Sequence, residues 1–112
     1  MDIVDREKPA YGNIRPRDLA ALHPRPRVID VRQPEEFAGE LGRLPGAELV
    51  PLATIQERAR QWSKDEALLV VCRSGARSAQ AAGILAQMGF GRVINLEGGM
   101  LQVNAEHLPV ER

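Results

Sequence analysis

The apolar residues of this chain fall in short runs, separated by polar stretches that are rich in glycine and proline. The most continuous run covers residues 67–72 and predicts a buried central strand, because a strand covered on both faces is apolar at successive positions. Shorter apolar runs predict further strands over residues 28–31, 47–52 and 92–96. The pattern therefore predicts a sheet of short strands.

Between the predicted strands, the spacing of the apolar residues is that of helices. Residues 78–88 carry apolar side chains on one face, and Gly89 is suited to end such a helix. Shorter helices are predicted over residues 17–22, 34–38, 53–62 and 100–106. Short strands that alternate with helices indicate βα units, and therefore an α/β fold with a parallel sheet covered by helices on both faces.

Composition and charge indicate one small domain. The chain has 112 residues, of which 44% are hydrophobic, enough for a modest core. Its 15 basic and 15 acidic residues balance, so nothing favours a nucleic-acid partner. The charged N-terminus does not suit a signal peptide, and no apolar run approaches the roughly 20 residues of a membrane-spanning helix. We therefore expect a soluble, cytoplasmic protein without a membrane partner, with a polar lead-in over residues 1–12 and one domain over residues 13–112.

The single cysteine stands at the most informative point of the sequence. Cys72 ends the predicted central strand, Gly75 follows in a short loop, and a helix is expected from Ser78. Ligands bind at the carboxyl ends of parallel strands, where a loop of this kind can turn several N–H groups toward an anion. The helix N-terminus adds partial positive charge, and Arg73 and Arg77 add two cations. These features favour the thiolate, so we expect a lowered pKa for the cysteine.

The alternative interpretation is an inert cysteine. A lone cysteine after an apolar strand is often a small buried hydrophobe. Such a residue needs neither a glycine-centred turn nor two flanking arginines, so the whole segment favours a reactive cysteine. The two histidines, His23 and His107, lie far from the loop and lack metal-ligand spacing, so no metal is expected.

The segment after the central strand resembles the active-site loop of rhodanese-like domains, the sulfurtransferases, and reads Cys72-Arg73-Ser74-Gly75-Ala76-Arg77-Ser78. The family's other signatures are matched, in order and spacing, by residues 28–37, 44–52 and 89–100. The resemblance implies a five-stranded parallel sheet flanked by helices, in the family's single-domain form. Two positions depart from the family pattern: Arg43 stands where a histidine is frequent, and Val103 where a tryptophan is usual.

The resemblance also implies a reaction without metal or organic cofactor. Cys72 would attack the outer sulfur of an anionic donor, such as thiosulfate or a persulfide, and form a persulfide of its own. A thiol, cyanide or a protein acceptor would then remove that sulfur. The persulfide would be bound by the N–H groups of the loop residues, which are Arg73, Ser74, Gly75, Ala76, Arg77 and Ser78.

Within and around that loop, individual side chains have separate expected roles. Arg73 is expected to attract the donor, whereas Arg77 is expected to support the loop with Glu36 as its partner. Ser78 could cap the following helix or reach the sulfur. Asp30 and Arg32, at the tip of a buried strand, are expected to pair with the backbone or with each other's neighbours and to brace the site.

Two other functions remain open at this point. One is a regulatory rhodanese-like module that binds without catalysis, although such modules often lack the cysteine. The other is a phosphatase or arsenate reductase of the same fold, in which five residues separate the cysteine from the arginine. Here four residues separate Cys72 from Arg77, and a phosphoryl group needs a wider loop than one sulfur atom does.

Overall fold

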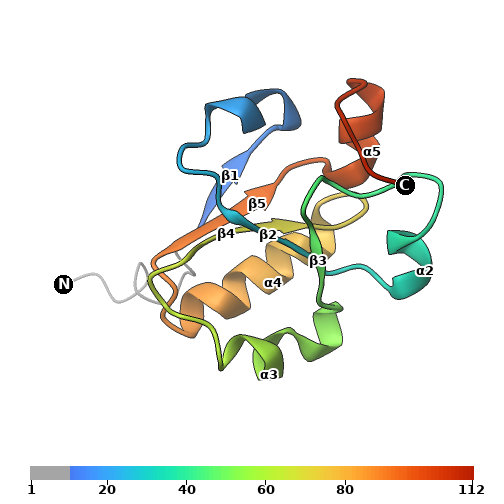
Figure 1. The fold of residues 1–112 in the computed structure, drawn as a ribbon. Helices are drawn as coiled ribbons and strands as arrows, with labels where there is room; N and C mark the ends of the chain where they lie inside the picture. The colour runs from blue at the N-terminus through green and yellow to red at the C-terminus, as the bar shows by residue number, and fades with distance from the viewer. Residues whose placement is uncertain (1–10) are drawn as a thin grey trace.

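A computed structural model describes residues 11–112, and its centre is a five-stranded sheet in which every strand pair is parallel. The strands run in the order β1-β5-β4-β2-β3 (Figure 1). Their bounds are Gly12–Ile14 for β1, Arg27–Asp30 for β2, Glu48–Leu49 for β3, Ala67–Val71 for β4 and Arg92–Leu96 for β5. The expected five-stranded parallel sheet is confirmed, with β4 at its centre.

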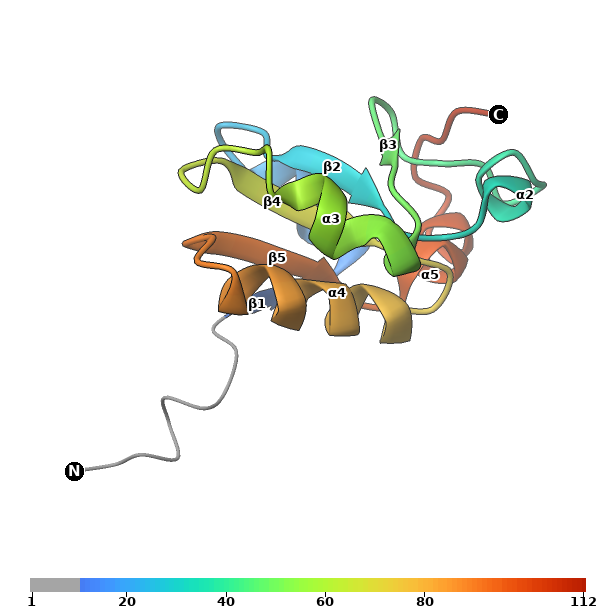
Figure 2. The same ribbon diagram turned by 90° about the horizontal axis from the view of Figure 1, so that it is seen from below.

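Helices cover both faces of this sheet, as predicted. The helices α3 (Ile55–Ala59) and α4 (Ala76–Gln87) lie on one face, and α5 (Gly99–Ala105) and the 3-10 helix η1 (Pro16–Ala21) lie on the other (Figures 1 and 2). The short helix α2 (Pro34–Phe37) stands beyond the carboxyl ends of the strands, and the 3-10 helix η2 (Leu52–Thr54) leads into α3. None of the helices formed by residues 11–112 is long and apolar enough to cross a membrane.

The core explains why the sequence of β4 is apolar throughout. Leu68 and Val70 pack in the cluster shared with α3 and α4, whereas Leu69 and Val71 pack in the cluster shared with α5. All four side chains are at most 2% exposed. Because both faces of the strand are buried, no polar residue alternates with the apolar ones.

The structure differs from the sequence prediction at several element ends. Gly12 lies in β1 and pairs with Ile94, so the sheet begins one residue before the predicted domain boundary; residues 1–10 of the predicted lead-in lie outside the described part of the chain. The strand predicted over 47–52 is only Glu48–Leu49, and the helix predicted over 53–62 is split into η2 and α3. The helix predicted from residue 78 begins at Ala76.

Candidate active site

Cys72 follows the last residue of β4 and lies at the carboxyl edge of the sheet, with only 1% of its surface exposed. The chain then turns within three residues, and Gly75 is the N-cap of α4. Gly75 has a φ of 104°, and a β-carbon there would come within 3.2 Å of the backbone nitrogen of Gly98. Glycine therefore allows both the left-handed turn and the close approach of the two loops.

The first turn of α5 orients this loop. The N–H of Met100 donates to the carbonyl of Cys72 at 2.9 Å, and the N–H of Leu101 donates to the carbonyl of Arg73 at 3.0 Å. A β-carbon on Gly99 would overlap both carbonyl oxygens, so only glycine allows this contact. In a planar trans peptide the C=O and the next N–H point in opposite directions. Because these carbonyls point toward α5, the N–H groups that follow them point away from it.

The sulfur of Cys72 is surrounded by hydrogen-bonding groups. The N–H groups of Gly75 and Ser78 donate to Sγ at 3.0 Å and 3.3 Å, and Oγ of Ser78 is also 3.3 Å from Sγ. Burial of the sulfur raises its pKa, but hydrogen bonds with Ser78, Gly75 and Ser74 together outweigh burial and hold the pKa of Cys72 below its ordinary value of 9.0. The site thus favours the thiolate, the nucleophilic form of cysteine.

Ser78 belongs to a chain of hydrogen-bonded polar side chains that includes Asn95, a residue not predicted from the sequence. Ser78 is the third residue of α4 and not its cap, and its hydroxyl donates to Oδ1 of Asn95 at 2.5 Å. Nδ2 of Asn95 in turn donates to Oδ1 of Asn13 at 3.1 Å. An asparagine among the apolar residues 93–96 of β5 is a signal that could have identified this residue.

Arg77 and Glu36 are in contact, as the sequence analysis expected for this pair. Two guanidinium nitrogens of Arg77 donate to the two carboxylate oxygens of Glu36, at 2.7 Å and 2.8 Å. The pair holds the pKa of Glu36 at about 2 against partial burial, assisted by the N–H of Gln33. Because the guanidinium is held by both carboxylate oxygens, this contact joins the start of α4 to α2.

Asp30 and Arg32 form a buried ion pair directly with each other. Nε and one terminal nitrogen of Arg32 donate to the Asp30 carboxylate at 2.9 Å and 2.8 Å, and both side chains are at most 1% exposed. Asp30 pairs with Val71 in the sheet, so the ion pair lies next to the residue that precedes Cys72. Arg32 also donates to the carbonyls of Glu36 and Gly42, which ties the segment after β2 to the strand.

The comparison with known proteins agrees with this geometry. Residues 15–106 match the family model of the rhodanese-like domain. This chain belongs to the rhodanese-like domain family. A sulfurtransferase of Allochromatium vinosum is 41% identical over 83 residues, which cover 74% of this chain and 76% of that protein. The name of that relative supports the general class of sulfurtransferases.

Solved structures share this fold. A rhodanese-like domain protein of Staphylococcus aureus is 33% identical, with a TM-score of 0.74, over 90% of this chain and 99% of that one. A protein of Rhodopseudomonas palustris, described as of unknown function and a possible tyrosine phosphatase, is 25% identical with a TM-score of 0.81, over 90% of this chain and 85% of that one.

The remaining residues of interest lie at the rim of this rhodanese-like domain or behind its site. Arg73 is exposed, and no hydrogen bond of its guanidinium is found within residues 11–112. Arg43, one departure from the family pattern, lies with its guanidinium 4.9 Å from the centre of the Phe37 ring. Val103, the other departure, is fully buried on α5 beside Met100. Both departures therefore fill packing positions and do not touch the sulfur.

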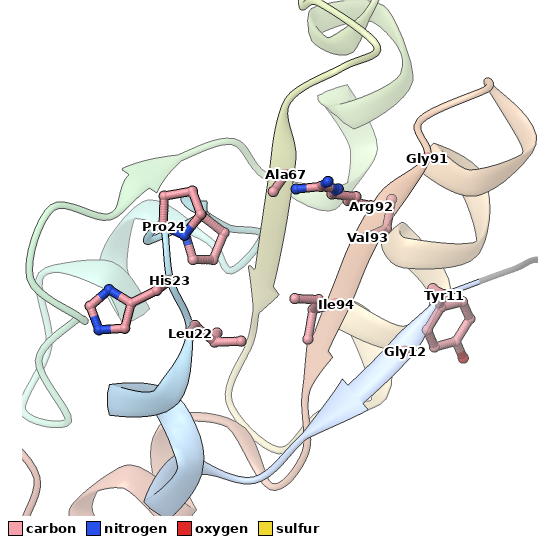
Figure 3. A pocket seen from close by; sticks show the side chains of 11 residues that line it. Tyr11, Gly12, Leu22, His23, Pro24, Ala67, Gly91, Arg92, Val93 and Ile94 are labelled. Carbon is pink, nitrogen blue, oxygen red and sulfur yellow. The ribbon is translucent and has the colours of Figure 1, made fainter.

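A pocket of about 510 Å³ lies elsewhere on the domain, between β1, β5 and the segment after η1 (Figure 3). Its lining includes Ala67 and Arg92, the first residues of β4 and β5. The pocket is thus at the amino end of the sheet, opposite the end that carries Cys72. It does not belong to the candidate active site.

Proposed function

We propose that this rhodanese-like domain is a sulfurtransferase that carries sulfane sulfur as a persulfide on Cys72. The observation that carries the proposal is the position of Sγ, which accepts hydrogen bonds from two backbone N–H groups at the start of α4. Backbone donors and a helix N-terminus stabilise negative charge on a thiolate and on a persulfide alike. The chemistry therefore needs no metal ion at the sulfur.

In the first half of the proposed reaction, the Cys72 thiolate attacks the outer sulfur of thiosulfate. The new S–S bond forms as the bond between the two sulfurs of thiosulfate breaks, and sulfite leaves with the electron pair. Cys72 then carries a persulfide whose outer sulfur is negatively charged. The N–H groups of Ala76 and Arg77 precede the first intrahelical hydrogen bond of α4, made by Ala79 to Gly75, and are the donors we assign to that charge.

In the second half, the thiolate of an acceptor attacks the outer sulfur of the persulfide. The Cys72 thiolate leaves with the electron pair and returns to its hydrogen bonds with Gly75 and Ser78. A low pKa makes Cys72 a good leaving group at this step. Cyanide can replace the thiol in an assay, and a small thiol or a thiol on a protein could serve as the acceptor.

The charged side chains around the sulfur have supporting roles in this proposal. Arg73 is an exposed residue of the loop and attracts the anionic donor. The Arg77–Glu36 and Asp30–Arg32 pairs hold the two segments that flank the loop. Because Arg77 is bound to Glu36, its guanidinium is not available to bind the donor.

The test is mass spectrometry of the protein after incubation with thiosulfate. We expect one added sulfur atom on Cys72, lost again when a thiol is added. Cys72→Ser is the matched control, because serine is nearly isosteric and a far weaker nucleophile at neutral pH. If the folded Cys72→Ser protein transfers sulfur from thiosulfate to cyanide at the parent rate, the proposal is wrong.

The two competing functions fit the site less well. A phosphatase needs its loop arginine to hold phosphoryl oxygens, whereas both terminal nitrogens of Arg77 are bound to Glu36. A module that only binds would need neither a buried cysteine nor the donors aimed at its sulfur. Hydrolysis of a phosphotyrosine peptide that depends on Cys72, without any sulfur transfer, would favour the phosphatase instead.

A further inference from the structure

The hydroxyl of Ser78 has one proton and three acceptors within reach. Its oxygen is 2.5 Å from Oδ1 of Asn95, 3.1 Å from the carbonyl oxygen of Gly75 and 3.3 Å from Sγ of Cys72. A hydroxyl donates one hydrogen bond, and a short contact is the stronger one. The proton therefore points to Asn95, and the lone pairs of the Ser78 oxygen face the sulfur.

Asn95 is held in the orientation that this arrangement requires. The parallel register pairs Asn95 on β5 with Asn13 on β1, and Nδ2 of Asn95 donates to Oδ1 of Asn13 at 3.1 Å. With its NH₂ group bound to Asn13 on β1, Asn95 turns its oxygen toward Ser78. Asn95 is 5% exposed and Ser78 is fully buried, so water does not compete for either group.

We propose that Asn95 is a positioning residue for Cys72: its oxygen holds the Ser78 proton, so that Ser78 meets the sulfur as an acceptor of the thiol proton and not as a donor to the thiolate. This inference adds a residue to the proposed sulfur transfer. Only the benefit to catalysis rests on that proposal, whereas the orientation of the Ser78 hydroxyl does not. The thiolate is then stabilised by backbone N–H groups, and the thiol by the Ser78 oxygen.

A Ser78 hydroxyl turned to the sulfur would be a large cause of the lowered pKa of Cys72; with its proton on Asn95, the lowering rests on the backbone N–H groups of Ser78, Gly75 and Ser74. Without Asn95, the Ser78 proton would be free to turn to the thiolate, because a charged acceptor forms a stronger hydrogen bond than the neutral carbonyl of Gly75. The nucleophilicity of a thiolate falls as its pKa falls, so an over-stabilised Cys72 would attack the donor more slowly. Asn95 therefore preserves the reactivity of the thiolate.

The charged groups around the sulfur do not change when a neutral asparagine is replaced by a neutral residue. These groups are Arg77 on α4, Glu36 on α2, the Asp30–Arg32 pair at the end of β2, and the exposed Arg73 and Glu97. The first turn of α5 carries no titratable side chain. A shift in the titration of Cys72 on such a substitution can therefore be assigned to the Ser78 hydroxyl.

The experiment measures the rate of alkylation of Cys72 by iodoacetamide as a function of pH. We expect Asn95→Leu to move the midpoint about half a unit to one unit lower, because the freed hydroxyl donates to the thiolate. The shift should vanish when Ser78→Ala is added, since no hydroxyl is then present. Gln80→Leu, at an exposed position of the same helix, is the matched control and should leave the midpoint unchanged.

Ser78→Ala alone gives a test that does not depend on the folding of the Asn95 variant. The proposal expects an unchanged or lower midpoint, because the lost oxygen stabilised the thiol. A midpoint raised by half a unit or more would show that Ser78 donates to the thiolate and would overturn the proposal. An Asn95→Leu shift that persists without the hydroxyl, or no shift in a folded Asn95→Leu protein, would also overturn it.

Alkylation does not require sulfur transfer, so the two proposals fail separately. A parent protein that takes up no sulfur from thiosulfate would contradict the proposed function, while the midpoints would still decide the role of Asn95.

Discussion

Arg77 on α4 and Glu36 on α2 form a two-point ion pair, with hydrogen bonds of 2.7 Å and 2.8 Å between residues 41 positions apart in the sequence. Both side chains are about one third exposed. The pair connects α4, the helix that follows the active-site loop, with α2, which stands beyond the carboxyl ends of the strands. The pair therefore fixes the position of α2 relative to the start of α4, where Cys72 receives its hydrogen bonds.

The two arginines of the loop should respond differently to substitution. Arg77→Ala leaves Glu36 without its partner and should lower the free energy of unfolding by about 1–2 kcal/mol, together with activity. Arg73→Ala removes an exposed charge and should change stability by less than about 0.5 kcal/mol. Its expected effect is a higher KM for thiosulfate with little change in kcat. Thermal melts and thiosulfate kinetics measure both, and an Arg73→Ala protein less stable than Arg77→Ala would contradict this division.

Glu36 should make stability depend on pH in the acid range. Its pKa is lowered from 4.5 to about 2 in the folded protein, chiefly by the hydrogen bonds from Arg77. A carboxyl with a lowered pKa stabilises the fold fully above its unfolded value, and this contribution is lost as pH falls from about 4.5 toward 2. We expect the stability difference between the parent and Glu36→Gln to be largest above pH 5 and to shrink toward pH 2.

Denaturant melts at a series of pH values measure that difference. Glu57→Gln is a suitable control, because the pair that Glu57 forms with Arg60, at 3.4 Å, is exposed. A gap between the parent and Glu36→Gln that stays constant from pH 6 to pH 2 would contradict the assignment of the ion pair.

The buried pair should be far more sensitive than an exposed one. Asp30→Asn leaves the Arg32 guanidinium charged and without a counter-ion in a fully buried position, which should cost about 3–5 kcal/mol of stability. Glu48→Gln is the matched control, because Glu48 binds Arg27, which lies on β2 like Asp30, through two bonds of 2.7 Å and 2.9 Å but is 43% exposed. We expect it to cost less than about 1 kcal/mol. Equal losses in urea melts would show that burial does not govern these pairs.

The sequence predicted those parts of the fold whose signals are local. The run over β4 is apolar because both of its faces are buried, and the predicted bounds of β5 are those observed. The strand β1 escaped prediction because a three-residue edge strand that contains Gly12 and an exposed Asn13 carries no apolar pattern. Because an edge strand such as β1 needs no apolar run, the sequence pattern there is that of a loop.

The part of the site that lies in one continuous segment was predictable from the sequence. The loop from Cys72 to Ser78 is one segment, so the sequence alone indicated its chemistry. Asn95 acts on Ser78 from another strand, and its orientation depends on the register between β1 and β5. No local pattern determines that register. The direct pairing of Asp30 with Arg32 likewise depends on how the chain turns after β2.

The contact between α5 and the active-site loop can be tested at Gly99. This residue has a φ of 55°, and a β-carbon there would overlap the carbonyl oxygens of Cys72 and Arg73. Gly99→Ala should therefore push α5 away from the loop and weaken the hydrogen bonds that orient its peptides. We expect a loss of stability of at least about 2 kcal/mol, from backbone strain and overlap together. The pKa of Cys72 should rise, because the N–H groups turn away from the sulfur.

Gly46→Ala separates the strain from the overlap. Gly46 also has a left-handed backbone, with a φ of 78°, but no atom lies within 4 Å of the position of its missing β-carbon. This variant should lose only the strain energy, about 1 kcal/mol, and should keep the alkylation midpoint of the parent. Urea melts and alkylation across pH compare the two variants. If Gly99→Ala is no less stable than Gly46→Ala and keeps the parent midpoint, α5 does not orient the loop.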